Sequence, residues 1–232
     1  MKILALESSA KAASAALCDG ERLLGQYFQN TGLTHSRTLL KMVEDMLNNL
    51  EMTVRDLDAV AVAVGPGSFT GIRIGVAAAK GLAWGAEKPL VPVSTLEAMV
   101  WQVPREDCVI CPVMDARRSQ VYNALFEFRD GEPVRMAPDR AISLEELISE
   151  AKNSEKPYFL VGDGAEMCYN SMLDAGCGVL LAPPVLRYQT ASGVARSALR
   201  IPPVSPNEVV PNYLRLSQAE RERLEKANSA NQ

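Results

Sequence analysis

A glycine-rich turn is the stretch of this sequence whose residue types and spacing could do chemistry most directly. Residues 64–75 have the sequence V-G-P-G-S-F-T-G-I-R-I-G. Glycines let the backbone adopt positive φ and approach another group closely, and a turn from a strand into a helix can hold an anion with its N–H groups and the helix dipole. Two hypotheses therefore stay open: an anion cradle, and a structural turn that packs a helix tightly against a strand.

The turn differs from the familiar phosphate-binding loops. It lacks the Gly-Lys-Ser/Thr ending of a Walker loop and the G-x-G-x-x-G spacing of a dinucleotide fingerprint. It also lacks a lysine, so backbone amides and Arg73 alone would meet the charge of a bound anion. We therefore expect phosphate to bind here weakly, or only within a complex.

Candidate nucleophiles and metal ligands are few. The chain has one histidine, His35, and so neither an HExxH pattern nor a histidine pair for a metal. Its five cysteines, an odd number, favour reduced thiols over a disulfide framework. Cys108 and Cys111 form a C-x-x-C within an apolar run that ends at Pro112, which favours strand cysteines and leaves a redox role open. We predict no catalytic residue and no metal site.

The composition is that of a globular protein, with 232 residues, 47% apolar and 22% charged. The formal net charge of −4, without a cluster of Lys and Arg, argues against a protein that grips nucleic acid by itself. The chain begins with a strand-like run, with no signal-peptide pattern and no long apolar span. We therefore expect no membrane association and a cytoplasmic location.

The elements that would position these residues alternate between strands and helices. Apolar runs predict early strands at residues 3–8, 13–18, 22–28, 57–63 and 90–93, and helices at residues 34–50, 72–84 and 95–101. A polar, proline-marked segment at residues 104–107 is the best boundary, and after it strands and helices start again, with a capping box at Ser143. We predict two lobes, residues 1–103 and 104–232, the second ending in a charged helix from Gln218 to Asn228.

Two helices of the first lobe are too apolar to be covered by one sheet. The apolar residues of the helix at 34–50 span an arc of roughly 160° at 100° per residue, and the helix that begins at Ile72 is apolar nearly all round. A neighbouring helix, another protein, or both must supply a second cover. The residues predicted at a partner interface are Leu39, Val43, Met46, Leu47, Gly71, Gly75, Ala78 and Leu82.

Four segments together resemble one protein family. They are MKILALESS at the start, GPGSFTGIRIG in the turn, MDARRSQVY from Met114, and PNYLR from Pro211. In this order they are similar to the bacterial TsaB (YeaZ) family, and the resemblance spans nearly the whole chain. It implies an α/β fold of two lobes with the actin-like ATPase and sugar-kinase (ASKHA) architecture, each lobe a mixed sheet with helices.

The resemblance also implies a function. TsaB is the dimerisation subunit of the machinery that places threonylcarbamoyl on the tRNA adenosine beside the anticodon. A member is expected to be non-catalytic, to bind a TsaD-type transferase subunit through its first-lobe helices, and to work with a TsaE-type small ATPase. It would meet tRNA only through the complex, and the isolated chain could form a homodimer.

The implied architecture adds Glu7 to the candidate site. Kinase-like ATPases of this type carry an acidic residue at the end of the first strand, for Mg²⁺ or a water, and Glu7 holds that place where the resembling family usually has Asp. A carboxylate that ends a strand in solvent is the alternative. The predicted nucleotide or anion site comprises Glu7, Gly65, Gly67, Ser68, Thr70, Gly71 and Arg73, with ATP or ADP held only in the complex. Residues 115–118 could form ion pairs across the cleft or a charged hairpin entry.

The catalytic relative TsaD is similar to this chain in its first lobe and holds its metal with two histidines four residues apart. Those positions fall here on Thr95 and Met99, and a hydroxyl and a thioether cannot replace two imidazoles. The alternative function is a stand-alone ATP-dependent kinase or a peptidase of the glycoprotease group. It would need Mg²⁺ at Glu7, or a metal or nucleophile that the sequence does not display.

Overall fold

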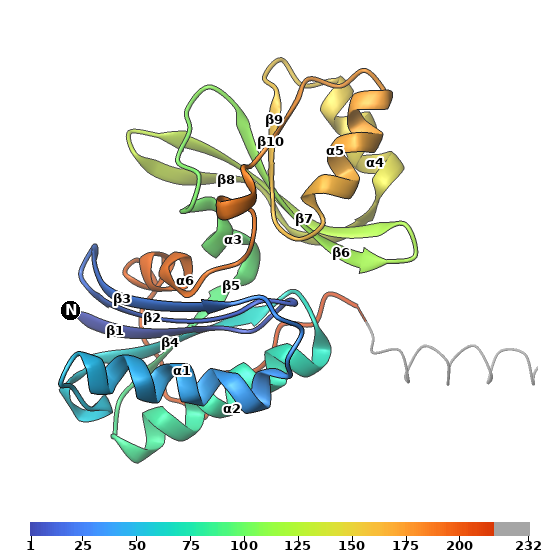
Figure 1. Ribbon diagram of the computed structural model, residues 1–232. Helices are drawn as coiled ribbons and strands as arrows, with labels where there is room; N and C mark the ends of the chain where they lie inside the picture. The colour runs from blue at the N-terminus through green and yellow to red at the C-terminus, as the bar shows by residue number, and fades with distance from the viewer. Residues whose placement is uncertain (216–232) are drawn as a thin grey trace, which may run out of the picture.

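The computed structural model describes residues 1–215, which form two α/β lobes stacked one on the other (Figure 1). The first sheet has the order β3-β2-β1-β4-β5, with β2 antiparallel to β1 and to β3, and with β4 parallel to β1 and to β5. Its strands are β1 (Lys2–Glu7), β2 (Ala13–Asp19), β3 (Arg22–Gln29), β4 (Ala59–Gly65) and β5 (Leu90–Ser94). The α/β class and the two mixed sheets with helices are confirmed. The predicted tail helix at 218–228 lies outside the described residues.

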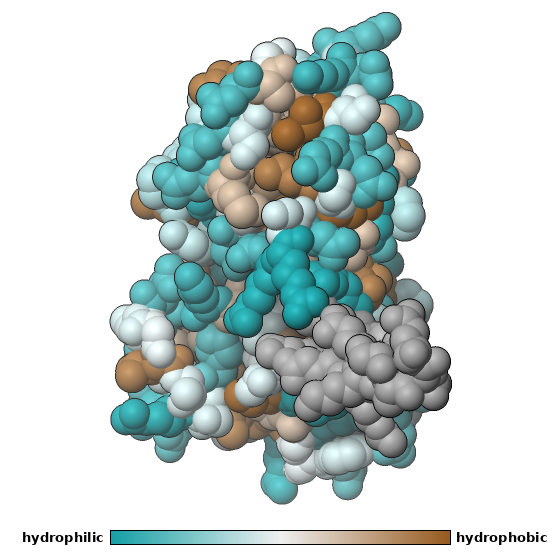
Figure 2. All heavy atoms as spheres, turned by 90° about the vertical axis from the view of Figure 1, so that its right-hand side faces the viewer, coloured by the Kyte–Doolittle hydropathy of each residue, from teal (hydrophilic) through white to brown (hydrophobic). Residues whose placement is uncertain are grey.

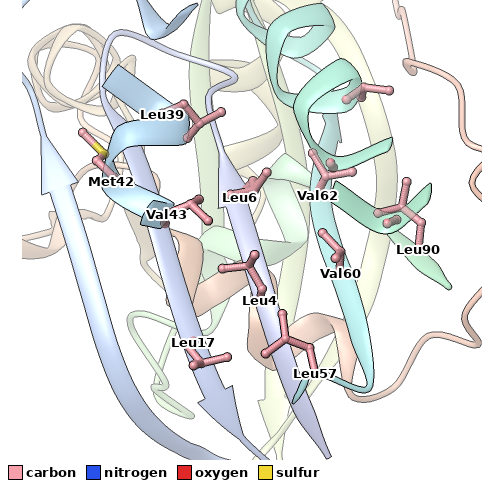
Figure 3. Packing of buried hydrophobic residues seen from close by; sticks show 14 of the residues in the cluster. Leu4, Leu6, Leu17, Leu39, Met42, Val43, Leu57, Val60, Val62 and Leu90 are labelled. Carbon is pink, nitrogen blue, oxygen red and sulfur yellow. The ribbon is translucent and has the colours of Figure 1, made fainter. Parts of the chain in front are cut away.

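Helices cover both faces of the first sheet (Figure 1). On one face lie α1 (His35–Asn49) and α2 (Phe69–Gly85), side by side, with a 3₁₀ turn, η1 (Val54–Asp56), between α1 and β4. Leu39 and Val43 of α1 point toward β1 and Leu6, in a core where Met42 and Leu4 are also buried (Figure 3). This face is closed because α1 and α2 also touch each other, so each helix gives the other the second cover that its wide apolar arc requires.

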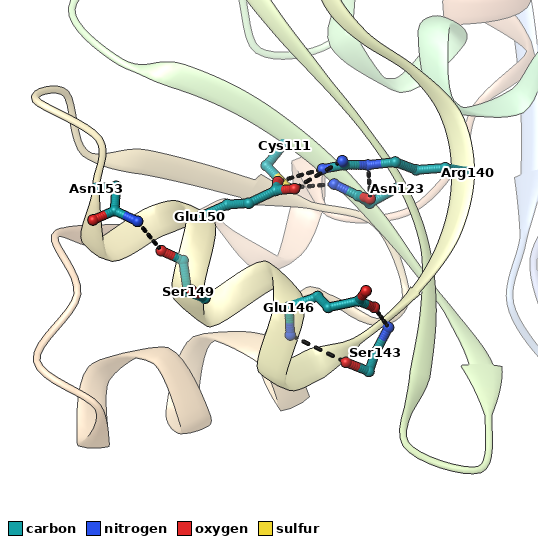
Figure 4. Close-up of polar contacts among 8 residues, drawn as sticks. All are labelled: Cys111, Asn123, Arg140, Ser143, Glu146, Ser149, Glu150 and Asn153. Atoms are coloured by element: carbon teal, nitrogen blue, oxygen red, sulfur yellow. Dashed lines mark hydrogen bonds and ion pairs between the residues drawn. The ribbon is translucent and has the colours of Figure 1, made fainter.

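The second sheet has the order β10-β9-β6-β7-β8. Its strands are β6 (Val109–Arg117), β7 (Gln120–Arg129), β8 (Glu132–Ser143), β9 (Tyr158–Val161) and β10 (Val179–Leu181), and its helices are α4 (Leu144–Lys152) and α5 (Ala165–Asp174), with a 3₁₀ turn η2 (Pro184–Leu186). The capping box at the start of α4 is confirmed: Glu146 N–H donates to Ser143 Oγ at 3.1 Å, and Ser143 N–H donates to the Glu146 carboxylate at 2.8 Å (Figure 4). Arg140 on β8 joins Glu150 of α4 to Asn123 of β7, so the helix is tied to the sheet by charge-assisted hydrogen bonds (Figure 4).

Two short helices fill the space between the lobes. α3 (Thr95–Val100) packs Leu96, Met99 and Val100 against the second sheet, and α6 (Ala191–Ala198) packs small residues against the other face of the first sheet. Gly193 of α6 lies directly on the backbone of Ala98, where a Cβ would collide with the carbonyl oxygen. The two helices therefore form a thin interlobe layer (Figure 1).

The predicted boundary at residues 103/104 separates the strands of the two sheets but not the packing of the chain. Beyond it, α6 lies on the first sheet, and Val204 pairs with Leu90 of β5. The C-terminal part of the described chain therefore returns to the first lobe, which corrects the assignment of residues 191–212 to the second. Within residues 1–215, no helix is long and apolar enough to cross a membrane.

Candidate functional site

A cleft of about 510 Å³ lies between the lobes. Its first-lobe wall comes from the β1–β2 loop and from the start of α2, and its second-lobe wall from the end of β6 and the turn after β9. A third wall is the segment 212–215, at the end of the described chain. The lining side chains include Lys11, Asp115, Arg117, Asp163 and Arg215, so the cleft is polar and carries both signs of charge.

Glu7 lies at the end of β1 behind the cleft lining and is fully buried. Its Oε1 accepts a hydrogen bond from Ser9 N–H at 2.6 Å, while Oε2 has no partner. Burial is the main cause that raises the pKa of Glu7 to about 7; the nearby Asp163 carboxylate acts in the same direction, and the hydrogen bond from Ser9 N–H acts against it. Of the two hypotheses for Glu7, the carboxylate in solvent is wrong.

The glycines of the turn are contact points for other parts of the backbone. A Cβ on Gly65 would collide with the carbonyl oxygen of Asn212, one on Gly67 with that of Ser9, and one on Gly71 with that of Ser8. Gly65 and Gly67 also have φ of 122° and 154°, which side chains disfavour. This geometry favours the structural hypothesis, in which the glycines allow close packing of β1, α2 and the segment 212–215.

The amides of the turn fit a phosphate poorly. Ser68 N–H already donates to the Ser9 carbonyl at 2.6 Å, and Gly71 N–H donates to Ser68 Oγ, which caps α2. Thr70 lines the cleft. Arg73 is turned to the ring of Phe69, 3.9 Å from its guanidinium carbon, and donates from Nε to the hydroxyl of Tyr213. The anion site itself stays a prediction.

The structure brings further residues to the cleft that the sequence analysis did not select. Asp163 follows β9 in a Gly-Asp-Gly turn, burial raises its pKa, and it accepts a hydrogen bond from Gln189 at 3.0 Å. Tyr213 and Arg215 close the cleft from the PNYLR segment. The Gly-Asp-Gly sequence directly after a strand was the available signal for Asp163. Asp115 accepts a hydrogen bond from the backbone of Arg117, two residues on, within the same turn.

Comparison with known proteins identifies the family. A curated protein of Bacillus subtilis, "tRNA threonylcarbamoyladenosine biosynthesis protein TsaB", is 30% identical over 97% of this chain and 99% of its own. The chain belongs to the TsaB family. A family model described as "TsaD: tRNA N6-adenosine threonylcarbamoyltransferase" also matches residues 29–198, so this part of the chain is similar to the transferase family as well.

Solved structures agree with this assignment. YeaZ from Pseudomonas aeruginosa is similar at 27% identity with a TM-score of 0.77, covering 92% of this chain and 99% of that protein. Component A of (R)-2-hydroxyglutaryl-CoA dehydratase from Acidaminococcus fermentans is similar in fold only, at 12% identity with a TM-score of 0.51. This chain therefore has the predicted actin-like ATPase and sugar-kinase architecture.

Thr95 and Met99, where the resemblance to TsaD places the histidine positions, lie inside this chain rather than in the cleft. Thr95 and Met99 are fully buried in α3, and Met99 packs in the interlobe core. Among residues 1–215, no group of three or more His, Cys, Asp or Glu side chains could hold a metal ion. Cys108 and Cys111 are buried free thiols on or beside β6, and burial raises the pKa of Cys108 to about 11.

The predicted partner interface needs correction. Its four α1 residues are buried in the core of this chain, because α1 lies over β2 and β3 as well as beside α2. Gly71 and Gly75 face Ser8 at the end of β1. Only Ala78 and Leu82 keep partial exposure. The α1–α2 surface, as it is called from here on, consists of Leu40, Ala77, Ala78, Gly81, Leu82 and Gly85.

Proposed function

We propose that this chain is a non-catalytic subunit of the machinery for tRNA threonylcarbamoyladenosine and that it binds a TsaD-type transferase through the α1–α2 surface. Family membership supports the pathway, because the relative from Bacillus subtilis is named for that biosynthesis. The match of residues 29–198 to the transferase family model supports the partner, since two related chains can pack the same helices against each other about a pseudo-twofold axis.

The main support for this proposal is a pair of glycines in α2, Gly81 and Gly85, that no close contact within the chain requires. A Cβ on Gly81 or Gly85 would meet nothing within 4 Å, whereas Gly71 and Gly75 each touch Ser8. Glycine in a helix interior costs about 1 kcal/mol relative to alanine. Gly81 lies beside Ala77 and Ala78 on one stripe of α2. Small residues on such a stripe allow a second helix to approach closely. Contact with such a helix would explain why α2 has glycines that lower the stability of the isolated chain.

Exposed apolar side chains accompany this stripe. Leu40 on α1 is 49% exposed and Trp84 near the end of α2 is 54% exposed. Buried in a complex, such side chains contribute roughly 25 cal/mol for each Å² removed from water, before the costs of association. The α1–α2 surface thus combines apolar area with room for a close helix contact.

The remaining parts of the proposal concern assembly. The TsaE-type small ATPase and the tRNA would be engaged by the complex rather than by this chain alone. In the absence of the transferase, the same α1–α2 surface would pair with a second copy, because a homodimer of related helices satisfies the same contacts. A tRNA-modifying complex of this kind works in the cytoplasm.

A pair of matched leucine variants tests the docking surface. Leu40→Glu places a charge on the α1–α2 surface, and Leu173→Glu places one on a leucine of α5 that is equally exposed, at 52% against 49%. We expect Leu40→Glu to weaken co-elution with the transferase subunit at least tenfold, since a charge buried in an apolar interface costs several kcal/mol unless it is paired. Leu173→Glu should co-elute as the wild type does. Equal binding by all three proteins would rule out this surface.

The rival function, a stand-alone ATP-dependent enzyme, has a test of its own. The amide of Ser68 and the side chain of Arg73 are engaged within the chain, and the turn has no lysine to meet a triphosphate. We expect calorimetry with Mg·ATP to show no micromolar binding by the isolated chain. Micromolar affinity would favour the kinase hypothesis.

A further inference from the structure

Residues Asn212–Arg215 of the PNYLR segment form a strap across the mouth of the cleft. Val209, just before it, is buried in the first-lobe core, and Asn212 N–H donates to the Val64 carbonyl at 2.7 Å. The ring of Tyr213 stacks on Phe69 with centroids 4.3 Å apart, and its hydroxyl accepts from Arg73 Nε at 2.8 Å. The strap is therefore held to the first lobe by backbone, stacking and cation–π contacts.

The same strap reaches the second lobe through one side chain. The guanidinium of Arg215 donates to the carbonyl of Ala116 and, at 3.4 Å, to that of Arg117. These carbonyls begin the turn between β6 and β7, where Arg117, Arg118 and Ser119 have φ of 63°, 54° and 56°. Three consecutive non-glycine residues in the left-handed region are strained. Arg215 thus connects the strap to a turn whose backbone conformation is energetically unfavourable.

The lobes are joined more firmly on the opposite edge. There, Arg135 of β8 pairs with Glu97 of α3 at 2.7 Å, and Glu132 of β8 receives two hydrogen bonds of 2.6 Å from Arg200, just after α6. In Figure 1, the β8 label and α6 lie on the left, whereas the end of the described chain leaves on the right, beside the β6–β7 end. On the face seen in Figure 2, strongly hydrophilic side chains gather at the level between the lobes. Side-chain ion pairs thus join the lobes at one edge, and Arg215 joins the strap to the second lobe at the other.

We propose that the strap, residues Asn212–Arg215, is a releasable closure of the interlobe cleft, with Arg215 as its fastening. Release of Arg215 frees the β6–β7 turn and uncovers the floor of the cleft, where Ser9 is fully buried with an unpartnered hydroxyl. The lobes themselves stay folded, because the strap contributes contacts to the cleft mouth while the cores of both sheets lie elsewhere. This closure does not depend on the proposed partner.

Hydrogen exchange of the full chain tests the closure. Arg215→Ala should speed exchange about tenfold at amides of the strap, of residues 64–70 and of residues 115–119, and leave the amides of α4 and β9 unchanged. Arg129→Ala, which removes an exposed arginine of β7 paired with Glu127, is the matched control and should change none of these regions. Unchanged exchange in Arg215→Ala, or faster exchange throughout the chain, would overturn the proposal.

The reactivity of a thiol at the cleft floor gives a second measurement. Loss of Arg215 should change this reactivity only if the strap controls access to the cleft. All five native cysteines are buried, so Ser9→Cys adds one reporter whose side chain replaces a hydroxyl without a hydrogen bond. We expect iodoacetamide to alkylate this thiol about tenfold faster in the Ser9→Cys, Arg215→Ala double variant than in Ser9→Cys alone. Equal rates, with both proteins folded by circular dichroism, would mean that the strap does not control access.

Discussion

The buried carboxyl group of Glu7 links the protonation of one residue to the stability of the chain. Its pKa of about 7 in the folded protein lies above the ordinary value of 4.5. Between these pH values the native state keeps a proton that the unfolded chain releases, so this contribution is fully present below pH 4.5 and is lost as the pH rises to 7. A shift of this size corresponds to about 3 kcal/mol.

Glu7→Gln should therefore stabilise the protein at pH 8 by up to about 3 kcal/mol, because the amide keeps an acceptor for Ser9 N–H and never ionises. Urea unfolding at pH 5, 6, 7 and 8 measures the effect as a difference from the wild type. Glu106→Gln, at an exposed glutamate, is the control and should follow the wild type at every pH. If Glu7→Gln loses stability with pH as steeply as the wild type does, the carboxyl group is already ionised in the native state.

The cysteines make a second prediction at this scale. All five are buried, and burial raises the pKa of Cys18 to about 11 and that of Cys168 to about 12. Thiolate is the reactive form of cysteine. Ellman's reagent should therefore label fewer than one thiol per native chain within minutes at pH 8, and all five in guanidinium chloride. Rapid labelling of two native thiols would instead support a reactive Cys108–Cys111 pair.

Sequence reasoning reached the identity of these residues but not their surroundings. The strand end at Glu7 was predictable. Its raised pKa was not, because it results from burial in the folded chain and from Asp163 in a turn more than 150 residues away. Likewise, the glycine spacing predicted close approach at the turn. It could not indicate that Asn212 and Ser9 are the backbones that approach.

At the scale of elements, apolar periodicity predicted both first-lobe helices and their wide apolar arcs. It did not predict that α2 begins at Phe69 inside the glycine turn, capped by Ser68. It also could not indicate which element packs against each apolar face of the two helices. The partner interface was predicted at Leu39, Val43, Met46 and Leu47, whereas these residues are buried in the core because α1 packs on β2 and β3 and touches α2. Short β10 carried too few residues for its own signal.

Two glycines of α2 allow a matched pair of substitutions. Gly81→Ala should stabilise the isolated chain by about 1 kcal/mol, raising Tm by about 2–4 °C, because nothing opposes the new methyl group. Gly75→Ala should destabilise it by about 1–3 kcal/mol, because the methyl group would collide with Ser8 Oγ. Thermal melting of both variants measures the contrast.

If Gly81 lies at the contact with the transferase subunit, Gly81→Ala should have opposite effects on stability and on association. Gly81→Ala should weaken binding to the transferase subunit despite its higher Tm, since the methyl group occupies the space of the approaching helix. A variant that melts higher and binds as the wild type does would show that Gly81 is not at the contact.

At the scale of the whole molecule, the sequence predicted two lobes, and the family resemblance predicted their architecture. Element order alone could not show that the chain crosses back, with α6 and the strap returning to the first lobe. That return brings all four of the resembling segments together: Ser9, Gly67, Ala116 and Tyr213 line or border one cleft. Only the folded structure shows that segments about 200 residues apart in the sequence line the same cleft.

The most direct test of a non-catalytic subunit is reconstitution of threonylcarbamoyl transfer to tRNA, measured as modified adenosine by mass spectrometry. The transferase subunit and the small ATPase are assayed with the wild-type chain, with Leu40→Glu, with Leu173→Glu, and without the chain, and the chain is also assayed alone. We predict sustained modification only with the wild type and Leu173→Glu, and none by the chain alone. Modification by the isolated chain, or equal modification in its absence, would contradict the account.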